Sequence, residues 1–149
     1  MRRGVRFGVD VGKARVGVAS CDPDGLLATP VETLPRAVAL ESLVQLSEER
    51  APLEIVVGLP IALSGGYTAS TQDAEQFARD LTELVTVPVR LVDERLSTVQ
   101  AAAGLRAAGR SSKNQRHVID QAAAVILLQH AVDSEKARGR LLVLKGNNA

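Results

Sequence analysis

An aspartate interrupts the first apolar strand pattern of the chain. Asp10 shares its strand face with Gly8 and Gly12, which leave room for a bulky group to approach the backbone. An ionised carboxylate in an apolar strand is costly unless it is paired or bound to a metal. We therefore interpret Asp10 as a metal ligand at the edge of a nucleic-acid or nucleotide cleft. The alternative is an ion pair with Arg6 or Arg15.

Two adjacent acids, Asp93 and Glu94, end an expected strand. In open α/β sheets, ligands bind outside the carboxyl ends of the strands. Because neighbouring strand residues point to opposite faces, only one of the two acids faces the cleft directly. We expect that residue to be Glu94, with Asp93 supporting it through a hydrogen bond to Arg95 or to a backbone amide. The alternative is a salt bridge at the strand end.

A third acid, Asp120, lies early in a helix that then becomes apolar. A helix N-terminus favours a carboxylate and, with Lys113 and Arg116 close by, favours a phosphate. The alternative role for Asp120 is compensation of the helix dipole. His117 lies three residues earlier, and we interpret it as a solvated helix residue.

Together the three acids indicate a metal-dependent hydrolase. Oxygen ligands suit Mg²⁺ or Mn²⁺. Two such ions about 4 Å apart can activate water and stabilise the leaving oxygen in phosphodiester hydrolysis. A metal-bound water needs no histidine base, which suits a chain with only 2 histidines. We expect Asp10, Glu94 and Asp120 to be both the metal ligands and the catalytic residues.

The net charge of +1 conceals an uneven distribution. Residues 1–21 hold five basic side chains and one acidic side chain. Residues 22–84 hold three basic and eleven acidic side chains, and residues 89–117 hold six basic and two acidic ones. If the two basic segments converge, they form a positive face for a polyanion. With only one Tyr, two Phe and no Trp, binding would rely on phosphates and shape rather than on base stacking. The expected phosphate contacts are Lys13, Arg15, Arg95, Lys113 and Arg116.

The pattern of apolar residues predicts how these groups are positioned. Strands are expected at 5–11, 15–20, 26–34, 54–59 and 88–93, and helices at 37–50, 74–85, 98–108 and 112–132. Hairpin-linked antiparallel strands come first and βαβ crossovers follow. This order predicts an α/β fold with a mixed central sheet and helices on both faces. Pro30 should sit on an edge strand or at a strand start.

The length of 149 residues suits a single domain, here 1–149, with its core at about 5–132. In the tail, 134–149, Leu141–Leu144 would form a short strand or pack loosely. The single cysteine, Cys21, excludes an intrachain disulfide and indicates a reducing compartment; we expect it to be a small buried apolar residue. No signal peptide or membrane span is evident, so we expect a soluble cytoplasmic protein.

Four motifs in order resemble the YqgF family, also called RuvX. They are GVDVGKARVGVA at 8–19, VGLP at 57–60, DERLST at 93–98 and IDQAAA at 119–124. The resemblance implies a ribonuclease H-like fold and a nuclease of pre-16S rRNA or of Holliday junctions. It places the family's acids at Asp10, the Asp93-Glu94 pair and Asp120. Many ribonuclease H-like enzymes use four carboxylates, so the number of metal ions stays open.

Three functions compete at this point. The first is a metal-dependent endonuclease of structured nucleic acid, processing either the 5′ end of pre-16S rRNA in ribosome biogenesis or four-way DNA junctions. A junction resolvase would be a two-fold homodimer. The second is a non-catalytic nucleic-acid or ribosome-binding factor. The third is a nucleotide-binding phosphotransfer domain of the actin-like type, which needs a second lobe that 149 residues do not provide.

Overall fold

Five strands of the described residues form one mixed sheet in a computed structural model of the chain. The structure describes residues 1–96 and 113–148, with side chains of the last helix described for 121–138. The strands are β1 (Arg6–Val11), β2 (Arg15–Cys21), β3 (Ala28–Pro35), β4 (Glu54–Leu59) and β5 (Val89–Asp93), in the order β3-β2-β1-β4-β5. β1, β2 and β3 are antiparallel, whereas β4 is parallel to β1 and β5. The predicted mixed sheet is confirmed.

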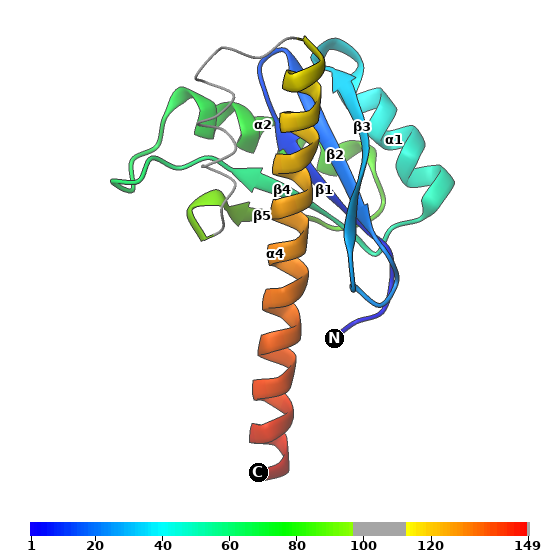
Figure 1. Ribbon diagram of the computed structural model, residues 1–149, viewed down its shortest axis with the longest axis vertical. Coiled ribbons are helices and arrows are strands. Elements are labelled where there is room, and N and C mark those ends of the chain that lie inside the picture. The colour runs from blue at the N-terminus through cyan, green and yellow to red at the C-terminus, as the bar shows by residue number, and fades with distance from the viewer. Residues whose placement is uncertain (97–112, 149) are drawn as a thin grey trace.

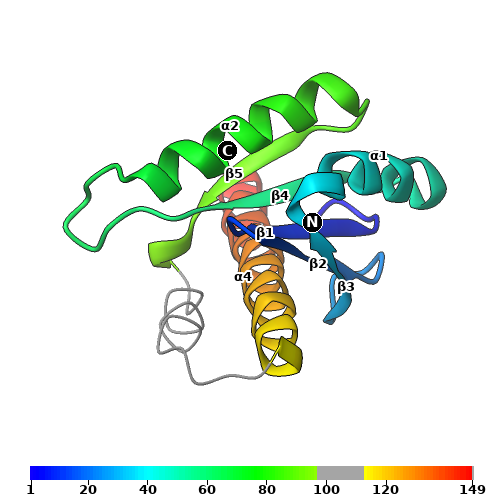
Figure 2. The ribbon, with the colours of Figure 1, turned by 90° about the horizontal axis from the view of Figure 1, so that it is seen from above.

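Helices cover both faces of this sheet (Figure 1). The described ones are α1 (Ala39–Arg50), α2 (Ala69–Leu84) and α4 (Lys113–Asn148), with short 3₁₀ turns η1 (Arg36–Val38) and η2 (Glu94–Leu96). Seen from above, α1 and α2 lie on one side of the sheet and α4 lies on the other (Figure 2). The helix expected at 98–108 falls outside the described residues.

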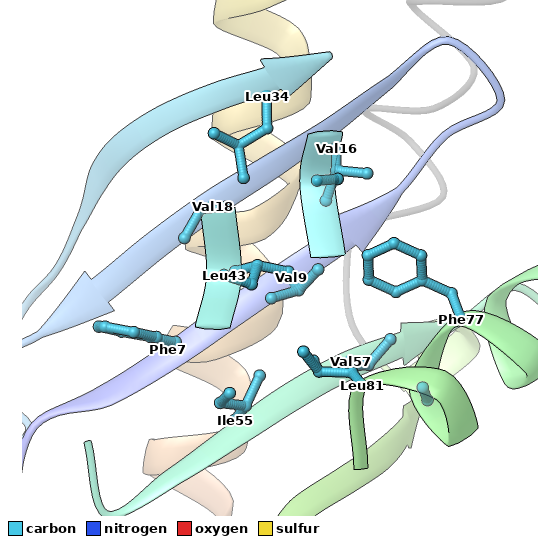
Figure 3. Close-up of a cluster of buried hydrophobic side chains, with 12 residues drawn as sticks. Phe7, Val9, Val16, Val18, Leu34, Leu43, Ile55, Val57, Phe77 and Leu81 are labelled. Atoms are coloured by element: carbon cyan, nitrogen blue, oxygen red, sulfur yellow. The ribbon is translucent and has the colours of Figure 1, made fainter. Parts of the chain in front are cut away.

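The alternation along β1 separates two buried layers. Phe7 and Val9 are fully buried and belong to the cluster that packs under α1 and α2 (Figure 3). Leu43 and Leu81 contribute to this cluster from the two helices. Side chains on the other sheet face pack against α4 in a second cluster. Because successive strand residues point to opposite faces, Asp10 belongs to the α4 side of β1.

Pro30 lies on β3, which is an edge strand of the sheet. Its position there is consistent with its missing backbone donor. The ladder between β2 and β3 shifts register beside it, since Val18 pairs with Glu32 while Ala19 pairs with Pro30. The prediction for this strand is confirmed. Cys21 is buried at the end of β2, as expected.

The last helix is longer than predicted. We expected it to end near residue 132 and the tail to form a short strand at 141–144 or pack loosely, but α4 continues to Asn148. No glycine or proline occurs between 113 and 138 to stop it. Two contacts tie its second half to the domain: Glu135 accepts a hydrogen bond from Arg6 at 2.6 Å, and Lys136 donates one to the carbonyl of Gly25 at 2.7 Å.

The apolar stretch at 122–128 of α4 is buried on one side only. Ala124 and Leu128 are fully buried against the sheet, whereas Val125 and Ile126 are half-buried. This pattern follows because α4 packs on a single sheet face. No helix of the described residues is long and apolar enough to cross a membrane.

Candidate active site

A pocket of about 300 Å³ opens at the carboxyl ends of β1 and β4. Its walls are the end of β1, the turn into β2, the start of the loop after β4, the beginning of α2 and the first residue of η2. The lining residues are Asp10, Val11, Gly12, Lys13, Ala14, Arg15, Pro60, Ser70, Asp73 and Glu94. The location agrees with the rule that open α/β sheets bind ligands beyond the carboxyl ends of their strands.

Two of the three predicted ligands, Asp10 and Glu94, share this pocket. Their residues are 3% and 4% exposed, so both carboxylates are held in largely buried positions. Asp10 comes from β1, and Glu94 follows β5, two strands away in the sheet. Buried carboxylates need partners or cations, and both of these have partners in the structure.

Glu94 reaches the pocket because β4, the strand between, has no side chain in its path. A Cβ atom built on Gly58 would lie 2.5 Å from Oε1 of Glu94 and 3.2 Å from its carboxyl carbon. Gly58 is part of the VGLP motif at 57–60, but its role was not predicted. The sequence signal for it is a glycine in an otherwise apolar central strand, where close approach of another group is a common reason.

Asp93 engages Arg95 instead of lining the pocket. Its Oδ1 accepts the backbone N–H of Arg95 at 2.8 Å, and its Oδ2 lies 2.7 Å from the guanidinium. The hydrogen bond to the Arg95 side chain lowers the pKa of the Asp93 carboxyl below its usual range. Asp93 is therefore ionised at neutral pH and fixes the turn that carries Glu94.

The two glycines beside Asp10 have different surroundings. A Cβ on Gly8 would lie 2.7 Å from Cβ of Leu128 and 2.9 Å from the carbonyl oxygen of Ala124, so α4 fills that space. A Cβ on Gly12 would lie 2.6 Å from the carbonyl oxygen of Arg15, across the turn. The interpretation that Gly8 leaves room for a bulky ligand is wrong, because α4 fills that space. Gly12 lines the pocket.

Residue 120 lies at the same level of the sheet as Asp10. Gln121 donates a hydrogen bond to Thr33 at 2.9 Å, Thr33 pairs with Gly17, and Gly17 pairs with Asp10. The backbone of α4 thus brings Asp120 over the row of residues that contains Asp10. The Asp120 side chain is outside the described ones.

The predicted phosphate contacts fall into three groups. Lys13 and Arg15 line the pocket directly. Arg95 is adjacent to Glu94, and its side chain is 33% exposed while paired with Asp93. Lys113 and Arg116 lie in the first turns of α4, with side chains outside the described ones, as is also the case for His117.

Two pocket residues from the start of α2 were not predicted, Ser70 and Asp73. Asp73 forms a bidentate ion pair with Arg36, both distances being 2.8 Å, and this pair lowers the pKa of the Asp73 carboxyl. The signal that could have located this helix start is Thr68 and Thr71, which form a reciprocal capping pair.

The donor chemistry of the pocket suits a hard divalent cation. Asp10 and Glu94 supply carboxylate oxygens from buried positions, and Asp120, which precedes Gln121 on α4, is the third candidate. Within 1–96 and 121–138, no cluster of three acids, histidines or cysteines has metal-binding geometry. The predicted set needs Asp120 to become complete. Asp10, Glu94 and Asp120 therefore fit Mg²⁺ or Mn²⁺ by ligand type.

Comparison with known proteins gives consistent results. The family model of RuvX, described as a Holliday junction resolvase, matches residues 4–134. A protein of Clavibacter michiganensis named "Putative pre-16S rRNA nuclease" is 58% identical over 143 residues, covering 93% of this chain and 89% of its own length. One of Streptomyces avermitilis with the same name is 56% identical, covering 94% and 92%.

Among solved structures, Thermus thermophilus RuvC in complex with a Holliday junction substrate matches with a TM-score of 0.56. The match covers 89% of this chain and 96% of the RuvC chain at 16% sequence identity. At that identity the similarity shows the fold alone. It confirms the ribonuclease H-like fold that the motifs implied.

Proposed function

The chain belongs to the RuvX family, and from that premise we propose that it is a metal-dependent endonuclease that trims the 5′ end of pre-16S rRNA in the cytoplasm. The observation that carries the proposal is the pocket that combines two buried carboxylates, Asp10 and Glu94, with the basic side chains of Lys13 and Arg15. This is the combination that phosphodiester hydrolysis needs: oxygen ligands for a cation and positive charge for the phosphates.

The residues of the proposed site have different roles according to their positions. Asp10, Glu94 and Asp120 would hold one or two Mg²⁺ or Mn²⁺ ions, which supply an activated water and charge stabilisation at the leaving oxygen. Lys13 and Arg15 bind the phosphates beside the scissile bond. Asp93 holds Arg95 at the turn of η2, and this contact keeps Glu94 in its orientation.

Relatives of more than 50% identity named as pre-16S rRNA nucleases favour an RNA substrate. The low aromatic content also favours recognition of shape and backbone, which is how structured RNA is mostly bound. The description of the family model supports the alternative, cleavage of four-way DNA junctions by a two-fold homodimer.

A gel cleavage assay tests the proposal. Labelled RNA containing the 5′ end of pre-16S rRNA and a labelled four-way DNA junction are incubated with the protein in Mg²⁺ and in Mn²⁺. We expect cleavage of the RNA by the wild type and none by Asp10→Asn. Asp24→Asn is the matched control, because Asp24 is exposed and pairs with Arg3 at the surface.

The outcomes separate the competing functions. Cleavage of the junction alone would identify a resolvase and contradict rRNA trimming. Binding of either nucleic acid without cleavage, in both metals, would contradict the nuclease and support a non-catalytic binding factor. Cleavage that persists in Asp10→Asn would remove Asp10 from the mechanism.

A further inference from the structure

Arg36 connects two walls of the pocket without lining it. It is the first residue of η1, directly after β3. Its backbone N–H donates to the carbonyl oxygen of Ala14 at 2.9 Å, and its guanidinium donates to the carbonyl oxygen of Gly12 at 2.9 Å. The same guanidinium forms the bidentate pair with Asp73. It also lies 5.1 Å from the ring centre of Phe77.

The first wall is the turn between β1 and β2. This turn is closed by a hydrogen bond from the N–H of Gly12 to the carbonyl oxygen of Arg15 at 2.9 Å. It presents Lys13 to the pocket. Arg36 holds the carbonyls of Gly12 and Ala14, which stand on either side of Lys13, so one residue fixes the turn at two points.

The second wall is the start of α2. Asp73 lines the pocket, while Phe77, one helical turn later, is only 3% exposed and belongs to the main core. The side chain of Arg36, whose guanidinium contacts both residues, is 28% exposed. Arg36 therefore connects α2, which is anchored in the core, to the turn that carries Lys13, and so fixes the turn relative to the helix.

The arrangement depends on the shape of the guanidinium and not only on its charge. The planar guanidinium donates three hydrogen bonds, one to Gly12 and two to Asp73, while it lies over the ring of Phe77. The single ammonium of a lysine cannot make all of these contacts. Asp73 also needs this partner, because an unpaired carboxylate in the pocket wall would repel a phosphate.

We infer that Arg36 is a positioning residue that holds the turn at residues 12–15 in the shape that binds a substrate phosphate. The inference rests on the proposed function, since it concerns how the same pocket binds nucleic acid. The Arg36 side chain acts through Gly12 and Asp73, whereas the bond to Ala14 comes from the backbone and is kept when the side chain is replaced. Loss of the side chain should therefore weaken substrate binding and leave the chemical step nearly unchanged.

The test compares Arg36→Lys with wild type in cleavage of the labelled pre-16S RNA and of the four-way junction. We expect KM to rise about tenfold and kcat to change less than about twofold. Binding is measured by fluorescence anisotropy in Ca²⁺ at several salt concentrations. In Arg36→Lys, the slope of log Kd against the logarithm of the salt concentration should be smaller than in wild type, by about one for each phosphate contact that is lost. Arg79→Lys is the matched control, an exposed arginine of α2 that pairs with Glu75.

A second variant separates positioning from folding. Asp73→Asn leaves the bond from Arg36 to Gly12 in place, so we expect a smaller rise in KM than in Arg36→Lys. Because Asp73 acts on the turn through Arg36, the double variant should be no worse than Arg36→Lys alone. Thermal melts of all variants check that each is folded at the assay temperature.

Two results would overturn the inference. Folded Arg36→Lys with the KM and salt slope of the wild type would show that the turn does not depend on this residue. A fall in kcat at constant KM would assign Arg36 to the chemical step instead. A wild type that neither binds nor cleaves either nucleic acid would instead refute the proposed function, and with it the basis of the inference.

Discussion

The backbone of Gly58 lies directly against the carboxylate of Glu94, so that a single added carbon on the glycine would meet Oε1 at 2.5 Å. Gly58 belongs to β4, which lies between the strand of Asp10 and the strand that precedes Glu94. The distance between the two carboxylates of the pocket is therefore set by a residue that has no side chain.

Gly58→Ala should reduce cleavage strongly while leaving the protein folded. The methyl group must displace the end of the Glu94 side chain, and a misplacement of about 1 Å at a catalytic group can cost about 100-fold in rate. The measurement is kcat on the labelled RNA, together with the urea midpoint. Gly66→Ala is the matched control: its nearest neighbour outside the adjacent residues would be Oγ of Ser64 at 3.7 Å. Equal rates in the two variants would contradict the role of Gly58.

Glu94→Gln and Asp93→Asn should have different effects, although the two acids are adjacent. Glu94→Gln keeps the shape of a pocket residue and removes the charge, so we expect cleavage to fall below detection and Mn²⁺ to bind more weakly. Asp93→Asn weakens the ion pair with Arg95. Mutation of such supporting residues lowers metal affinity or activity about 10- to 100-fold. Isothermal titration with Mn²⁺ and single-turnover cleavage distinguish them. A larger effect of Asp93→Asn would reverse the assignment.

Local pattern was enough to predict the strands that carry Asp10 and precede Glu94. The helix expected at 74–85 begins earlier, at Ala69, so Ser70 and Asp73 were missed. The strand at Glu54–Leu59 agrees at both ends, because an apolar run between Pro52 and Pro60 has little freedom. The ordering of strands in space follows from the hairpins and crossovers. The pattern of apolar residues could not predict which part of the protein packs against a glycine, because periodicity describes one helix or strand and not its neighbour. Gly8 is the example: its open face accommodates α4.

Ion pairs between residues far apart in the chain could not be predicted from the sequence for the same reason. Arg36 and Asp73 are 37 positions apart and lie in segments with no common pattern. The end of α4 was misjudged because the apolar stripe stops near Val132, whereas the helix is prolonged by polar contacts of Glu135 and Lys136. Side-chain polarity alone does not distinguish an anchored helix from a solvated tail.

Gly8→Ala should destabilise the fold. The new methyl group would lie 2.7 Å from Cβ of Leu128 and 2.9 Å from the backbone carbonyl of Ala124, and neither can rotate away. Overpacking of this kind costs about 1–3 kcal/mol. Urea denaturation at neutral pH gives the change in the free energy of unfolding, with Gly66→Ala again as control. Unchanged stability would mean that α4 can lift from β1 at little cost.

A buried ion-pair network closes the opposite end of the sheet. Glu54, at the start of β4, has a side chain that is 4% exposed, and it accepts hydrogen bonds from Arg90 at 2.9 Å and from Arg2 at 3.3 Å. Arg6 lies 3.4 Å from the same carboxylate and also pairs with Glu135 of α4. The network thus joins β1, β4, β5 and α4.

This network predicts how stability depends on pH. Burial by itself raises the pKa of Glu54, but the bonds to Arg90 and Arg2 outweigh it, so the folded pKa lies below the ordinary value of 4.5. The unfolded chain therefore binds more protons in that range. The contribution of Glu54 is complete above about pH 4.5 and is lost as pH falls through the folded pKa. Wild type should lose unfolding free energy steeply in this window.

Glu54→Gln should be less stable than wild type at pH 7 by about 3 kcal/mol, because it removes a charge partner of the buried Arg6. The gap should narrow as the pH falls below 4.5, because Glu54 then takes up a proton in the unfolded wild type before it does so in the folded protein. Urea titrations at pH 7, 5 and 4 measure both quantities. Glu41→Gln, at an exposed position of α1, is the control and should follow the wild-type curve. A constant gap across this range would show that the protonation of Glu54 does not govern the acid stability of the fold.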